Sequence, residues 1–222
     1  QIVKREKVAY VDEHYYTAPG WYVWNHDFYD NYERGTTRVY LGEYAAHGPG
    51  RPANIESALC EALHYCSIER NGDVVAMTSY APLLAKRGHT QWNPDMIYFD
   101  NTDIYPTTTY WAQLMNGQNC GDRYLATRIT TTERRTGVQQ RLEASTVKNS
   151  RTGKTYLKIV NVTGIPATAT LAAPGIKSKE ARTVTLSGDW DDRDARPVEG
   201  KLKVEDGAKL ELPPYAFMIV EL

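Results

Sequence analysis

The chain has 222 residues, enough for one large domain or two small ones. Its 26 Lys and Arg against 27 Asp and Glu give a net charge of -1, which offers no strong field to nucleic acid or to an anionic membrane surface. Hydrophobic residues make up 41% of the chain and the mean hydropathy is -0.54, as in a globular protein rather than a disordered one. No stretch approaches the ~20 apolar residues of a membrane span.

Aromatic usage is uneven, with 16 Tyr and 5 Trp but only 3 Phe. Aromatic side chains with polar tips suit wet clefts such as sugar sites, although a Tyr-rich β-sheet gives the same count. The three Cys cannot form a disulfide framework, and we expect all of them to be ordinary thiols. Because the first residue is Gln and no leader-like stretch follows, we expect this chain to be cut from a longer protein.

The first half of the chain alternates strand and helix patterns. β-rich runs at Val8–Tyr16, Arg38–Tyr44 and Asp73–Tyr80 predict three strands. Aromatic residues at helical spacing predict a helix over Trp21–Tyr32. A second helix is predicted after Asn54, which suits an N-cap, and it ends near residues 71–72. Strands separated by single helices pair in parallel, so we expect the three strands to be neighbours.

The strand starts at Val8, Val39 and Val74 recur at about the step of a (β/α)8 barrel. Such a barrel needs roughly 250 residues, so only three of its eight units could fit. The first half is therefore either a small open α/β sheet or the last part of a barrel.

The second half changes to short strand candidates separated by turns that contain Gly. This pattern predicts an antiparallel sandwich, with one domain at residues 1–115 and the other at 116–222. The candidates are Tyr124–Thr131, Gln140–Val147, Thr155–Val162, Thr168–Ala172, Ala181–Leu186, Lys201–Val204 and Ala216–Leu222.

Polar residues stand at the ends of the predicted parallel strands, where such sheets place their chemistry. Strand alternation puts Asp12, His14 and Tyr16 on one face and Glu13 and Tyr15 on the other. In the next strand a carboxylate, Glu43, follows Gly42. Its position suits a barrel mouth, although spacing alone favours a strand-end Glu paired with an Arg.

Five motifs follow one another along the chain: Asp12–Tyr16, Gly42–Ala46, Glu69–Val75, Ser79–Leu83 and Trp92–Asn101. In this order they resemble one family, the α-L-arabinofuranosidases of glycoside hydrolase family 51, and Leu212–Phe217 resembles the last strand of that family. The resemblance implies an α/β plus all-β fold. The last three βα units of a (β/α)8 barrel would be followed by an antiparallel, jelly-roll-like β-sandwich.

The resemblance also implies retaining glycoside hydrolysis, in which one carboxylate attacks the sugar and another protonates the leaving oxygen. Glu43 matches the nucleophile, His14 and Tyr16 match the neighbouring active-site strand, and Asn93 is the nearest candidate for a further sugar contact. The acid/base Glu of the family follows an Asn, and no Asn-Glu dipeptide occurs here. We therefore expect this chain alone to be inactive.

The resemblance implies an arabinofuranosyl-containing polysaccharide as substrate, arabinoxylan or arabinan, and neither cofactor nor metal. The aspartates at 189–194 lack the spacing of a calcium loop, so we expect a solvated turn. For the protein's location we favour extracellular or periplasmic. An incomplete barrel would leave unpaired strand edges, and these would pair copies of the chain into a homo-oligomer. The alternative is a non-catalytic carbohydrate-binding or scaffold β-sandwich with a short α/β appendage.

Overall fold

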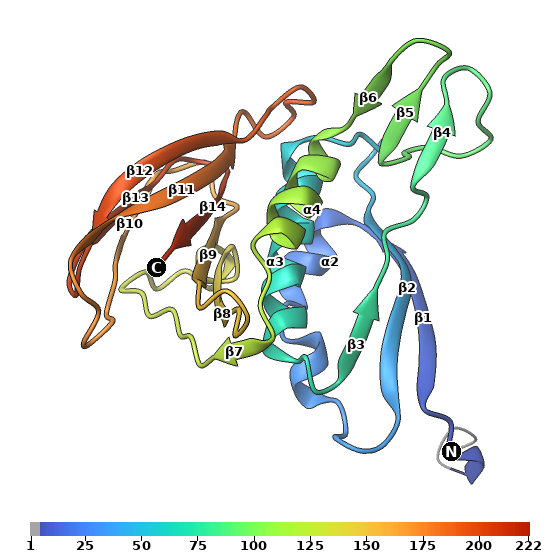
Figure 1. The fold of residues 1–222 in the computed structure, drawn as a ribbon. Coiled ribbons are helices and arrows are strands. Elements are labelled where there is room, and N and C mark those ends of the chain that lie inside the picture. The colour runs from blue at the N-terminus through green and yellow to red at the C-terminus, as the bar shows by residue number, and fades with distance from the viewer. Residues whose placement is uncertain (1–4) are drawn as a thin grey trace.

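The computed structural model describes residues 5–222, and Figure 1 shows two layered parts on either side of a pair of helices. The helices are α3 (Ile55–Arg70) and α4 (Thr108–Gln118). On one side lies a sheet of β1 (Tyr10–Thr17), β2 (Arg38–Ala46) and β3 (Val75–Thr78). Both pairings, β1 with β2 and β2 with β3, are parallel, which confirms the prediction of three neighbouring parallel strands.

The predicted N-cap of α3 is confirmed. Asn54 has extended backbone angles, and its side-chain oxygen accepts a hydrogen bond from the Ser57 backbone N–H at 3.0 Å. The helix ends at Arg70, as the Asn71-Gly72 pair predicts.

The single helix predicted over Trp21–Tyr32 is wrong. The structure has a short helix α2 (Pro19–Trp24) and then a 3₁₀ turn η1 (Phe28–Asn31). Asn25 interrupts the helix because its side-chain amide donates to the Trp21 carbonyl at 2.8 Å. The break turns His26 toward the second half of the chain, where its Nδ1 lies 2.7 Å from the Glu143 carboxylate.

A small sheet follows β3 and has no counterpart in the sequence-based expectations. It consists of β4 (Leu84–Lys86), β5 (Ile97–Phe99) and β6 (Ile104–Pro106), with β4 parallel to β5 and β5 antiparallel to β6. Figure 1 shows it projecting beyond the first turn of α4.

The second half forms a six-stranded antiparallel sheet in the order β12-β11-β14-β9-β8-β7, faced by the antiparallel pair β10-β13. The elements are β7 (Arg123–Leu125), α5 (Thr136–Gln139), β8 (Leu142–Lys148), β9 (Thr155–Asn161), β10 (Ala167–Thr170), β11 (Lys179–Ser187), β12 (Val198–Val204), β13 (Lys209–Leu212) and β14 (Ala216–Glu221).

The strand predicted over Tyr124–Thr131 shrinks to the three residues of β7. The reason is local: the Thr127 hydroxyl donates to the Leu125 carbonyl at 2.7 Å, and the Thr127 N–H donates to the Tyr124 hydroxyl at 3.2 Å. These bonds replace the ladder that a longer strand would need. β13 was not expected from the sequence.

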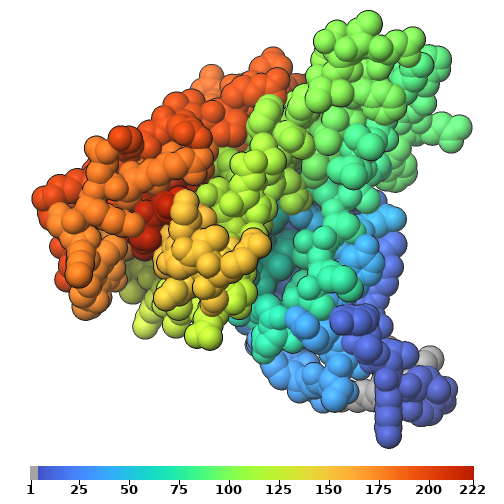
Figure 2. Space-filling model, in the orientation of Figure 1, coloured from blue at the N-terminus to red at the C-terminus, as the bar shows by residue number. Residues whose placement is uncertain are grey.

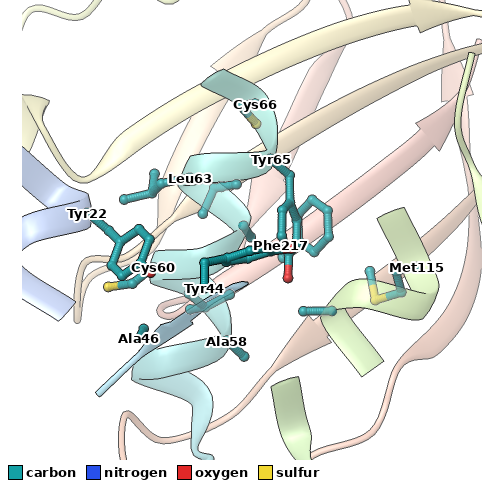
Figure 3. Close-up of a cluster of buried hydrophobic side chains, with 14 of the residues drawn as sticks. Tyr22, Tyr44, Ala46, Ala58, Cys60, Leu63, Tyr65, Cys66, Met115 and Phe217 are labelled. Atoms are coloured by element: carbon teal, nitrogen blue, oxygen red, sulfur yellow. The ribbon is translucent and has the colours of Figure 1, made fainter. Parts of the chain in front are cut away.

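The central strands β9 and β14 of the six-stranded sheet are buried on both faces. Along β14, Phe217 and Ile219 join the core formed with α3 and α4, while Met218 and Val220 join a second core under β10 and β13. Figure 3 shows Phe217 and Tyr65 of α3 among the buried side chains of the first of these cores. The predicted boundary at 115/116 falls within α4, and the division into two domains stays a prediction.

Charged groups also join the two parts, which lie closely against each other in Figure 2. Lys158 of β9 is fully buried, forms an ion pair with Glu69 of α3 and donates to the Asn116 side-chain oxygen at 2.6 Å. At the other end of α3, the carbonyls of Asp192 and Trp190 accept from the Ile55 and Glu56 N–H groups, each at 2.9 Å. The β11–β12 loop thereby satisfies free donors of the α3 N-terminus.

Candidate active site

The Glu43 side chain owes its direction to a β-bulge in β2. Glu13 pairs with Leu41 and His14 pairs with Glu43, so Gly42 is an extra residue between them. Without the bulge, alternation would turn Glu43 the same way as buried Leu41, toward α3. The bulge instead places it on the same face as His14 and Tyr16, a known use of bulges beside active sites.

Glycine at the bulge leaves room for two side chains of β1. A Cβ on Gly42 would lie 2.2 Å from Asp12 Oδ1 and 3.0 Å from His14 Nε2. The strand pattern therefore places a glycine where two side chains of β1 cover the β2 backbone.

Tyr16 and His14 both meet one oxygen of Glu43. The Tyr16 hydroxyl donates to Oε2 at 2.6 Å, and His14 Nδ1 lies 3.5 Å from the same atom. Burial, and then the hydrogen bond to Glu43, raises the pKa of Tyr16, so its hydroxyl keeps its proton and donates it to the carboxylate. Within residues 5–222, Glu43 Oε1 accepts no hydrogen bond. The Glu43 side chain is 40% exposed.

Aromatic rings line the site beside Tyr16, and the sequence-based site did not include them. His47 stacks on Tyr16 with ring centres 5.2 Å apart, and the exposed Trp92 lies 5.9 Å from the same ring. The Arg51 guanidinium covers Trp92 at 5.1 Å. Burial, and then the charge of Arg51, lowers the pKa of His47 and keeps its ring neutral. In the sequence, the only pointer to this aromatic surface was the tryptophan that precedes Asn93.

Asn93, the fourth predicted site residue, lies in the same loop as Trp92 but is otherwise engaged. Its side-chain oxygen accepts from the Tyr98 hydroxyl at 2.9 Å, and its carbonyl accepts from Arg51 at 3.3 Å. In the described part of the chain, no hydrogen bond joins its side chain to Glu43.

The opposite face of β1 is structural. Glu13 accepts from the Tyr32 hydroxyl at 2.8 Å, and the Tyr15 hydroxyl bonds to buried His64 at 2.7 Å. Burial lowers the pKa of His64 to about 3, so its ring is neutral. These contacts fix β1 against α3 and turn the Glu13 carboxylate away from Glu43.

Within residues 5–222, no group of three or more His, Cys, Asp or Glu side chains is arranged to hold a metal ion. None of the helices described is both long and apolar enough to cross a membrane.

Known proteins resemble this chain both in sequence and in fold. The family model of the α-L-arabinofuranosidase C-terminal domain matches residues 20–215, which places the chain among the α-L-arabinofuranosidases. An arabinose-bound family 51 α-L-arabinofuranosidase superposes with a TM-score of 0.87 at 27% identity, over 96% of this chain and 36% of that one. The chain belongs to the α-L-arabinofuranosidases of glycoside hydrolase family 51 and corresponds to their C-terminal portion.

Curated relatives agree with this assignment. The chain is 41% identical over 132 residues to an extracellular exo-α-L-arabinofuranosidase of Streptomyces chartreusis, covering 60% of this chain and 16% of that protein. It is 30% identical over 229 residues to α-L-arabinofuranosidase 2 of Arabidopsis thaliana, covering 96% of this chain. The match spans 33% of the Arabidopsis protein, so the chain accounts for only part of the length of its relatives.

Proposed function

We propose that this chain supplies the nucleophile half of a retaining α-L-arabinofuranosidase, with Glu43 as the nucleophile. The observation that carries the proposal is the bulged Glu43 with Oε2 held by Tyr16 at 2.6 Å and Oε1 left open. In such a reaction Oε1 attacks the anomeric carbon as the glycosidic bond breaks and the second carboxyl protonates the leaving oxygen. Water then hydrolyses the resulting glycosyl ester and releases the sugar and the Glu43 carboxylate. By donating to Oε2, Tyr16 orients the carboxylate.

The parallel strands β1, β2 and β3 fit the last three strands of a (β/α)8 barrel, with the sandwich as a C-terminal domain. His14, Tyr16 and Asn93 would line the sugar site, and the ring of Trp92 offers a further apolar surface to a sugar. The substrates would be terminal arabinofuranosyl groups of arabinoxylan or arabinan. The Streptomyces relative supports an extracellular location.

The isolated chain would be inactive for a geometric reason. Retaining hydrolysis needs a second carboxyl about 5–5.5 Å from the nucleophile to protonate the leaving oxygen. Glu13 is bound on the opposite face of β1, and Asp12 is hydrogen-bonded to His14 at 2.8 Å. The acid would come from the part of the relatives' length that this chain does not cover. Until that part is present, the unpaired edges of β1 and β3 would favour a homo-oligomer.

The test compares two proteins on an aryl α-L-arabinofuranoside: this chain, and a full-length protein that contains it. We expect cleavage only by the full-length protein, and loss of that activity in its Glu43→Gln variant. Efficient cleavage by this chain would contradict the argument from the missing acid. Polysaccharide binding without cleavage by the full-length protein would instead support the non-catalytic carbohydrate-binding alternative.

A further inference from the structure

We propose that Asp12 is a positioning residue that fixes the His14 ring against Glu43, an inference that rests on the proposed role of Glu43. Asp12 Oδ2 lies 2.8 Å from His14 Nε2, and His14 Nδ1 lies 3.5 Å from Glu43 Oε2. The three side chains thus form a chain of contacts from Asp12 through His14 to Glu43. Nothing in the family match or in the relatives' names assigns a role to Asp12.

The contact between Asp12 and His14 is built into the backbone beneath it. Both side chains lie over Gly42, where a Cβ would approach Asp12 Oδ1 to 2.2 Å, Asp12 Cγ to 3.0 Å and His14 Nε2 to 3.0 Å. The Gly42 carbonyl in turn accepts from the Ser79 hydroxyl at 2.6 Å, and that hydroxyl lies 2.9 Å from the Tyr40 hydroxyl. The glycine that re-aims Glu43 therefore also makes the space in which Asp12 meets His14.

The chemical consequence concerns which ring atom faces the nucleophile. A carboxylate can only accept, so Asp12 fixes Nε2 of His14 as an N–H donor and leaves Nδ1 as the atom presented to Glu43. Without Asp12, a half-exposed imidazole would be free to turn about its side-chain bonds, and the atom beside Glu43 Oε2 would no longer be defined. Asp12 would thus act on Glu43 only through His14.

The first test is spectroscopic and needs no activity. In ¹⁵N-labelled chain, long-range ¹H–¹⁵N spectra identify His14 as the ring whose signals vanish in His14→Gln. We expect a protonated Nε2 with a downfield proton. Asp12→Ala should remove that proton signal. Asp12→Asn should move it upfield, because a neutral oxygen is a weaker acceptor.

Gly42→Ala tests the same contact from the other strand. The added methyl must displace Asp12, so the same proton signal should be lost. Gly35→Ala is the matched control, since a Cβ on Gly35 meets nothing within 4 Å, and it should leave the signal unchanged. The ring signals of His64, bonded to Tyr15 behind the strand, report that each variant is folded. An unchanged His14 proton signal in folded Asp12→Ala would overturn the proposal.

The second test uses the full-length protein and a substrate with a poor leaving group. Misplacing a reacting group by about 1 Å can cost ~10²-fold in rate, so we expect kcat to fall by up to about 100-fold in Asp12→Ala, with a smaller change in KM. Wild-type kcat in that variant would overturn the positioning role even if the NMR signal is lost. If the wild-type protein itself shows no arabinofuranosidase activity, the proposed function fails, and the spectra alone decide whether Asp12 fixes His14.

Discussion

Glu61 provides a quantitative test of the core that supports the site. This α3 carboxyl is fully buried, and its Oε1 accepts from the Ala46 N–H at 2.9 Å, at the end of the strand that carries Glu43. Burial raises the pKa of Glu61 from 4.5 to about 8. Between those two values the unfolded carboxyl is ionised while the folded one keeps its proton. The folded state binds more protons there, so stability falls as pH rises.

The size of the effect follows from the same numbers. Each pKa unit corresponds to 1.36 kcal/mol, so the shift of Glu61 amounts to a loss of up to about 5 kcal/mol between pH 4.5 and pH 8. Glu61→Gln keeps an oxygen for the Ala46 N–H but cannot ionise. We therefore expect the free energy of unfolding of the variant, relative to wild type, to increase by several kcal/mol from pH 5 to pH 9.

The assay is urea unfolding followed by tryptophan fluorescence at pH steps between 5 and 9. Glu56→Gln, on the same helix but partly exposed, is the control and should keep the wild-type pH slope. Parallel stability profiles of wild type and Glu61→Gln across this range would refute the reasoning.

Three further variants test contacts described above. Lys158→Ala leaves Glu69 without its buried partner. Urea unfolding should show a free energy of unfolding lowered by about 3–5 kcal/mol. A change near zero would contradict a structural role for this pair. Tyr16→Phe removes a hydrogen bond to a charged acceptor, and such a bond contributes about 1.5–3 kcal/mol. The kcat/KM of the full-length protein should therefore fall roughly 10- to 150-fold. Wild-type activity in this variant would exclude the proposed orientation of Glu43. Partial burial of His26 lowers its pKa, but its bonds to the Glu143 carboxylate and to Gln140 outweigh this, and its pKa is raised overall. The stability that this raised pKa contributes is complete below pH 6.5 and is lost as pH rises through the folded-state pKa. The destabilisation caused by His26→Gln should therefore be larger at pH 6 than at pH 9. An equal effect at both pH values would count against this contact.

The features that the sequence predicts well are those set by local pattern. The helix α3 follows from apolar spacing and from Asn54, whose side chain caps it as expected. The parallel strands follow from their β-rich runs and the helices between them. The grouping of His14, Tyr16 and Glu43 at one edge follows from the resemblance to a family, because spacing alone favoured a strand-end Glu paired with an Arg.

The features that the sequence could not reveal depend on tertiary contacts. The three-residue strands β4 and β5 exist only because Leu84 pairs with Ile97 across a long loop, and no period is visible in so short a run. The threonines after Tyr124 are β-prone, yet their hydroxyls bond locally and end the strand. The bulge at Gly42 is invisible to strand alternation, although a glycine inside a strand is its usual sign.

The most direct test of the central claim is to trap the nucleophile. A 2-fluoro arabinofuranoside with an activated leaving group, incubated with a full-length protein that contains this chain, should accumulate a covalent glycosyl ester. Peptide mass spectrometry should then place the sugar on Glu43, and the Glu43→Gln variant should take up no label. Label on Asp12 or another carboxylate, or turnover with inversion and no covalent adduct, would contradict the account.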